Sequence, residues 1–151
     1  MRNEAEVCTI IKNSFIAIGE ECWKIPDPTG DFASTIKRPF DMFGSFEGNP
    51  LYLEVKYMNK MQSFNLNRIE DHQIEALDSL QRKIPTAHCG IALGIKVGRG
   101  DNRIIFFHNI NEIKVRRKQK QNYLKKELES MSYFEIHSNL IDLIHNSFAL
   151  D

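Results

Sequence analysis

The 151-residue sequence lacks an excess of charge of either sign, because 20 lysines and arginines balance 20 acidic residues. Most small nucleic-acid-binding domains are basic overall, so contact with a polyanion would have to be made by a local patch. The sequence also lacks any run of 18 apolar residues, which predicts that no helix spans a membrane. Its N-terminus lacks a signal-type apolar segment. We therefore expect a cytoplasmic protein without a membrane partner.

Cysteine is scarce: Cys8, Cys22 and Cys89 are widely spaced, odd in number and form no CxxC pair. This pattern is typical of buried thiols in a reducing compartment, and it disfavours a disulfide framework. The five histidines show neither H-x3-H nor HExxH spacing, which disfavours zinc. No glycine-rich phosphate loop is present, so we expect no nucleotide cofactor.

The composition is that of an ordinary globular domain, with 42% hydrophobic and 26% charged residues. The length predicts a single domain over residues 1–151. Hydrophobic periodicity predicts helices over 3–18, 69–82, 110–115, 119–131 and 139–148. It predicts strands over 22–25, 87–97 and 103–108, and a β-hairpin within 39–57 with a four- or five-residue connection at 47–50. This order predicts an α/β domain with a central sheet covered by helices.

Three charged residues of the predicted hairpin form the most informative group. Asp41 lies near the start of one strand, and Glu54 and Lys56 lie two residues apart on its partner. Alternation along a strand puts Glu54 and Lys56 on one face, and Leu53 and Val55 on the other, toward the core. Two carboxylates this close repel each other and raise each other's pKa unless a cation lies between them.

This group suits hydrolysis of a phosphodiester bond. Mg²⁺, or Mn²⁺ as a substitute, binds to one or two carboxylates and keeps several waters, which makes Asp41 and Glu54 candidate metal ligands. Lys56 is a candidate catalytic residue that would orient the attacking water or stabilise the charge of the transition state. The same spacing also occurs by chance, and it would then represent a surface salt bridge on a hairpin.

Gln73 belongs to the predicted buried stripe of the helix over 69–82, together with Ile69, Ala76, Leu77 and Leu80. A buried amide that lacks hydrogen bonds costs roughly 1–3 kcal/mol. A polar active site beside the sheet would supply them and would make Gln73 a candidate catalytic residue. A core glutamine bonded to the backbone is the alternative.

Glu6 lies at the margin of the apolar stripe of the first helix, four residues before Ile10. From this position it could reach a shared metal as a further catalytic acid, and Glu4 is a close competitor. The alternative is an exposed glutamate that the helix dipole favours in the first turn.

Taken together, the segments Phe40-Asp41, Leu53-Glu54-Val55-Lys56 and 64–77 resemble the core of RecU-type Holliday junction resolvases in the PD-(D/E)xK nuclease superfamily. The resemblance covers roughly residues 4–113, and an F-x-L…HQ segment after the E-x-K strand makes it more specific than the general nuclease pattern. It implies a restriction-endonuclease-like fold with a central mixed β-sheet flanked by helices. It also implies a Mg²⁺-dependent homodimer that nicks two strands of branched DNA.

The resemblance also implies a role for each matching residue. Asp41 and Glu54 would be metal ligands, and Lys56 the catalytic lysine. Gln73 would be the supporting polar residue of the helix, and Glu6 the acid of the first helix.

The sequence departs from this family in one segment. RecU-type enzymes carry a long basic stalk before the catalytic aspartate, whereas only residues 26–39 fill that interval here, with Lys37 and Arg38 as its basic residues. Specificity for four-way junctions therefore stays open. A restriction- or repair-type nuclease acting on duplex DNA is one alternative, and a catalytically silent DNA-binding module of the same fold is another.

The densest basic run of the sequence falls between residues 114 and 126. Clustered lysines and arginines are suited to the phosphate backbone of DNA. The candidate DNA-binding residues of the chain are Lys37, Arg38, Lys114, Arg116, Arg117 and Lys118. The alternative for the later four is a solvated helix face that Glu127 and Glu129 partly neutralise.

Overall fold

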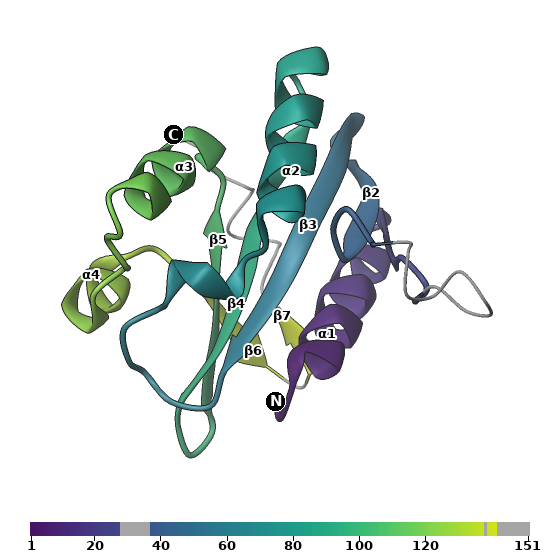
Figure 1. Ribbon diagram of the computed structural model, residues 1–151. Helices are drawn as coiled ribbons and strands as arrows, with labels where there is room; N and C mark the ends of the chain where they lie inside the picture. The colour runs from purple at the N-terminus through teal and green to yellow at the C-terminus, as the bar shows by residue number, and fades with distance from the viewer. Residues whose placement is uncertain (28–36, 138, 142–151) are drawn as a thin grey trace.

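A seven-stranded sheet forms the centre of the computed structural model, which describes residues 1–27, 37–137 and 139–141 (Figure 1). The strands are β1 (Glu21–Lys24), β2 (Met42–Phe46), β3 (Asn49–Met58), β4 (His88–Gly98), β5 (Asp101–Phe107), β6 (Phe134–His137) and β7 (Leu140–Ile141). The helices are α1 (Glu4–Ala17), the 3₁₀ turn η2 (Leu66–Arg68), α2 (Asp71–Lys83), α3 (Ile110–Lys118) and α4 (Lys125–Ser130). No helix in these ranges is long and apolar enough to cross a membrane.

The strands lie in the order of the chain, and every neighbouring pair is antiparallel except β3 and β4. Parallel strands need a crossover, and here η2 and α2 supply it. The helices cover both faces, with α1 packed on β1, β3 and β7, and α2 packed on β3 and β4. Figure 1 shows α3 and α4 on the other side of the strands from α1. This architecture confirms the predicted restriction-endonuclease-like class, a central mixed sheet flanked by helices.

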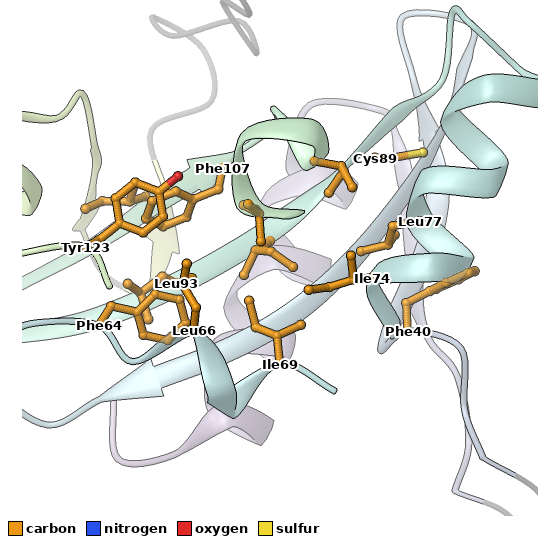
Figure 2. Close-up of a cluster of buried hydrophobic side chains, with 14 of the residues drawn as sticks. Phe40, Phe64, Leu66, Ile69, Ile74, Leu77, Cys89, Leu93, Phe107 and Tyr123 are labelled. Carbon is orange, nitrogen blue, oxygen red and sulfur yellow. The ribbon is translucent and has the colours of Figure 1, made fainter. Parts of the chain in front are cut away.

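Each face of the sheet has its own apolar cluster. On the α1 face, Leu53 and Val55 of β3 pack with α1, as the alternation of the sequence predicts. On the α2 face, the cluster joins α2, β4 and the segments around η2 (Figure 2). Two of its rings, Phe107 and Tyr123, lie with their centroids 4.8 Å apart. Because β3 is covered on both sides, polar side chains on it lie in a largely water-free layer.

The first helix forms and ends as the sequence predicts. The Asn3 side chain accepts a hydrogen bond from the Glu6 N–H and caps the N-terminus of α1. Two residues beyond the end of α1, Gly19 takes a positive φ of 78°, a conformation that glycine adopts without a steric penalty.

The hairpin connection differs from the prediction of four or five residues. The turn consists of Glu47 and Gly48 alone, since Phe46 pairs directly with Asn49. Both turn residues have positive φ, 51° and 79°, which is the conformation of a tight type I′ turn and matches the twist of the strands. The Glu47 N–H is bonded by the Glu20 side chain, which lies just before β1.

Helix boundaries near the middle of the chain also differ. The predicted helix over 69–82 begins at Asp71, because η2 and an extended Ile69 precede it. The predicted helix over 119–131 is wrong for its first half, and only α4 is helical. Tyr123 instead exchanges backbone hydrogen bonds with Phe64, which keeps this part of the chain extended.

The C-terminal helix predicted over 139–148 is wrong at its start, where Leu140 and Ile141 form β7. Ile141 is buried against α1, and its N–H donates to the Ser14 hydroxyl of that helix. The rest of that predicted helix lies outside the described residues. The sequence also gave no indication of β6, whose residues Phe134 and Glu135 pair with β5.

Candidate active site

Asp41 is held against β3 by the backbone. Its N–H donates to the Leu53 carbonyl at 3.0 Å, and its carboxylate Oδ2 accepts from the Val55 N–H at 2.8 Å. Met42 pairs with Leu53, so Asp41 comes opposite Glu54 at the end of the hairpin. Asp41 is 8% exposed. These contacts place its carboxylate on the α2 face of the sheet, where Glu54 also points.

Glu54 lies deeper and is 1% exposed. Its Oε1 lies 3.0 Å from the Lys56 Nζ and accepts a second hydrogen bond, at 2.8 Å, from Nε2 of Gln73 on α2. Its Oε2 is buried and has no hydrogen-bond donor among the residues that the structure describes. Asp41, just before β2, is therefore brought together with Glu54 and Lys56 of β3 and Gln73 of α2, as the sequence suggests.

Electrostatics makes Glu54 the most perturbed carboxyl group of this site. The pKa of Glu54 is raised from 4.5 to about 8, first by burial and then by the charge of Asp41. The adjacent Lys56 ammonium opposes this rise but does not cancel it. At neutral pH the metal-free chain therefore holds Glu54 largely protonated beside Asp41. A cation bound between the carboxylates would reverse this preference.

Gln73 uses both ends of its amide. While Nε2 donates to Glu54, Oε1 accepts from the Glu70 N–H at 3.0 Å, at the N-terminus of α2. The two sequence interpretations, a site partner and a backbone-bonded glutamine, thus both describe part of its bonding. The side chain is half-buried, and the fully buried residues of α2 are Ile74 and Leu77. Ile74, three residues before Leu77 and on the same face, was missing from the predicted stripe.

Arg38 also reaches this site, which sequence reasoning missed. Its Nη2 lies 3.2 Å from Oδ1 of Asp41, and its Nη1 contacts the Asp27 carboxylate and the Ile25 carbonyl. The carbonyl of Arg38 is hydrogen-bonded by His72 Nε2 at 2.9 Å. The sequence placed Arg38 among the DNA-binding residues, and only its spacing of three from Asp41 hinted at the contact. Its neighbour Lys37 remains exposed, with Glu70 4.0 Å away.

The acids of α1 lie apart from this centre. Glu6 is paired with Arg2 at 2.7 Å and faces the N-terminal ammonium at 3.9 Å. Glu4 is paired with Arg68 of η2. Burial raises the pKa of Cys8 on α1, and the charges of Asp41 and Glu4 raise it as well. Glu4 and Asp41 therefore share Cys8 as an electrostatic neighbour. The catalytic role of Glu6 stays a prediction without a contact to support it.

The predicted DNA-binding residues of α3 are largely engaged in ion pairs. Lys114 contacts Asp78 and Glu75 of α2, and Arg117 contacts Asp71 at 2.7 Å. Arg116 contacts Glu127 and Glu112, and its guanidinium covers the Tyr123 ring. Lys118 is exposed at the end of α3. Most of these charges are thus neutralised within the chain, and their role in DNA binding stays a prediction.

The donor set fits a hydrated Mg²⁺ or Mn²⁺ ion better than a fully coordinated structural metal. The described ranges contain no group of three or more His, Cys, Asp or Glu side chains that could hold a metal. Mg²⁺ needs only one or two carboxylates, since waters and substrate oxygens complete its octahedron. Glu54 Oε2, which lacks a donor, and Asp41 Oδ1 are the oxygens that could serve.

Comparison with known proteins gives a structural likeness but no match to a family. No protein-family model matches the chain, and no curated protein matches it. Among solved structures, the chain is similar to that of Hjc, a Holliday junction resolvase from the archaeal hyperthermophile Archaeoglobus fulgidus. The two share 12% sequence identity with a TM-score of 0.45, over 82% of this chain and 85% of that chain. At this sequence identity and TM-score, the likeness describes the fold alone and carries no argument about function.

Proposed function

We propose that this chain is a metal-dependent endodeoxyribonuclease that hydrolyses phosphodiester bonds in DNA. One observation supports this most strongly: Glu54 is fully buried beside Asp41, and its Oε2 lacks a hydrogen-bond donor within the described ranges. Buried groups whose pKa is shifted by burial and by a specific charged neighbour cluster at functional sites, and the pKa of Glu54 is raised by both. A purely structural ion pair, or a silent DNA-binding module, has no use for such an arrangement.

Asp41 and Glu54 would hold Mg²⁺, with Mn²⁺ as a substitute, through Oδ1 and Oε2. When bound, the ion would neutralise charge on the phosphate and lower the pKa of an attacking water. The Val55 N–H fixes Asp41, and the Gln73 amide fixes Glu54, so neither carboxylate has to reorganise. The Lys56 ammonium, held 3.0 Å from Glu54, would donate to the attacking water or to a phosphate oxygen.

Branched DNA is the substrate that we propose, cut by a homodimer of the RecU type with one active site in each subunit. This part rests on the resemblance of the E-x-K strand and the HQ helix to the junction resolvases. Lys37, Arg38 and the exposed Lys118 would contribute phosphate contacts. The ion pairs of Lys114, Arg116 and Arg117 make these three the weaker candidates.

Cleavage assays test the proposal. With Mg²⁺ or Mn²⁺ we expect nicking of a four-way junction, and Asp41→Ala or Glu54→Ala should abolish it while the variants stay folded. Glu129→Ala, on the exposed side of α4, is the matched control. Ca²⁺ should allow DNA binding with little cutting.

The outcomes separate the alternatives. Full activity in excess chelator would refute the metal assignment. Equal cutting of linear duplex and junction would indicate a restriction- or repair-type nuclease. Binding of DNA without cutting, in the presence of every metal tested, would indicate a silent module.

A further inference from the structure

The two carboxylates of the site differ in what their oxygens contact. Glu54 keeps Oε2 without a donor, although Lys56 and Gln73 bind its Oε1. Asp41 has no such oxygen, because Oδ2 accepts from the Val55 N–H and Oδ1 faces the Arg38 guanidinium at 3.2 Å. A cation can therefore join Lys56 on Glu54, but on Asp41 it must use an oxygen that a positive group already contacts.

A guanidinium and a divalent cation on one carboxylate oxygen repel each other. Asp41 is 8% exposed, so solvent screens this repulsion poorly. The Asp41 backbone is fixed by β3, and its Oδ2 bond leaves the carboxylate little freedom to turn. The cation must then displace the guanidinium, or bind more weakly beside it.

The Arg38 side chain can move while the backbone around it stays folded. Its side chain is 27% exposed, and its backbone is held separately by the hydrogen bond between its carbonyl and His72. Nη1 has a second anchor on Asp27 and Ile25, so the contact of Nη2 with Asp41 can be lost by itself. A guanidinium released beside the site would carry donors matched to a phosphate group.

We infer that, on the site proposed above, Arg38 is a latch that occupies Oδ1 of Asp41 in the metal-free chain. Metal binding releases it, and the released guanidinium binds a phosphate oxygen of the DNA. Metal and DNA therefore bind cooperatively, and by linkage each raises the affinity for the other by the same factor. Arg38 is a positioning residue before the metal arrives and a substrate contact afterwards.

Titration calorimetry with Mn²⁺ alone tests the first half. Arg38→Gln should bind Mn²⁺ about five- to tenfold more tightly than the wild type, since the competing cation is gone. Arg82→Gln is the matched control, because the exposed Arg82 lies in the last turn of α2 and pairs with Asp78, and the Mn²⁺ affinity of this variant should be unchanged. A merely structural role for Arg38 would lower Mn²⁺ affinity, so a gain is diagnostic.

DNA binding tests the second half. In Ca²⁺, Arg38→Gln should weaken binding to a four-way junction by about tenfold, the loss expected for one charge-assisted hydrogen bond. In chelator the same variant should bind DNA as the wild type does, because the latch is then closed on Asp41. An equal loss with and without metal would mean that Arg38 is an ordinary DNA contact, and it would overturn the latch.

The failure of the latch and the failure of the proposed function give different results. If the wild type binds Mn²⁺ and Arg38→Gln binds it no more tightly, the latch is wrong and the metal site stands. If neither protein binds Mn²⁺ at millimolar concentration, both the latch and the proposed metal site are refuted. Should Arg38→Gln not fold, Arg38→Met decides: it keeps the aliphatic stem but removes the competing charge, so tighter Mn²⁺ binding supports the latch and unchanged binding refutes it.

Discussion

At the scale of single residues, the buried Glu54 carboxyl group lowers the stability of the metal-free fold at high pH. Its pKa is raised from 4.5 to about 8, first by burial and then by Asp41, so the folded state binds its proton more tightly than the unfolded state does. Ionising Glu54 in the metal-free fold is therefore unfavourable. The stability linked to this group is fully present below about pH 4.5, and it is lost as the pH rises through about 8.

Replacing Glu54 with glutamine should remove this pH dependence. In chelator, Glu54→Gln and the wild type should melt at similar temperatures at pH 4.5. At pH 7.5 the variant should melt several degrees higher, since each ~1 kcal/mol shifts the melting temperature of a chain this size by about 2–4 °C. Calorimetry at both pH values measures the gap. A gap that is the same at both would contradict the shifted pKa, and Glu129→Gln should show none.

At the scale of elements, α2 connects the sheet to the site through Gln73. This residue completes the hydrogen bonding at the N-terminus of α2 and at the same time holds Glu54. The position of α2 over β3 and β4 thus determines the orientation of a carboxylate that lies on β3. A substitution here can separate the stability of the helix from the function of the site.

Gln73→Glu makes that separation. A glutamate can still accept from the Glu70 N–H, so the free energy of unfolding should change by less than about 1 kcal/mol. It cannot donate to Glu54 and adds a like charge beside it, so DNA cleavage should fall by at least about tenfold. Gln73→Ala should lose both contacts and be destabilised by roughly 1–2 kcal/mol. If Gln73→Glu cleaves as the wild type does, the bond to Glu54 has no part in catalysis.

The ion pairs of α3 give a second prediction at this scale. Arg116 binds Glu127 at 2.7 Å and stacks on Tyr123, so it joins α3 to α4 and to the core. Arg116→Gln should lower the free energy of unfolding by about 1–2 kcal/mol in urea denaturation. It should leave the salt dependence of DNA binding unchanged, whereas the loss of a true phosphate contact would reduce the slope by about one unit. Such a reduction would restore Arg116 as a DNA-binding residue.

At the scale of the whole molecule, the proposed cutting of two strands requires two active sites. Two-fold homodimers are the commonest oligomers, and the sequence resemblance implies one here. We expect sedimentation velocity at micromolar concentration, with junction DNA and Ca²⁺, to show a complex that contains two copies of the chain. A single copy bound to DNA under these conditions would rule out paired cutting and would leave a simpler nicking activity.

Local patterns determined much of this protein. The spacing of apolar residues placed α1 and β4, because helical and strand periodicities need no distant partner. Alternation along β3 likewise put Glu54 and Lys56 on one face and the core residues on the other. The grouping of the candidate site residues therefore could be predicted from the sequence, while their roles stay predictions.

Only the tertiary structure decided the features that depend on segments far apart in the chain. Tyr123 is extended rather than helical because Phe64 offers it backbone partners, and β7 exists because it packs on α1. The unsatisfied oxygen of Glu54 arises from burial under α2, which no local pattern encodes. The contact of Arg38 with Asp41 likewise depends on Ile25 and Asp27, which lie more than ten positions earlier in the chain and hold the same guanidinium. Hydrogen bonds, burial and charge pairing are set by three-dimensional proximity, and proximity of this kind is established only when the whole chain has folded.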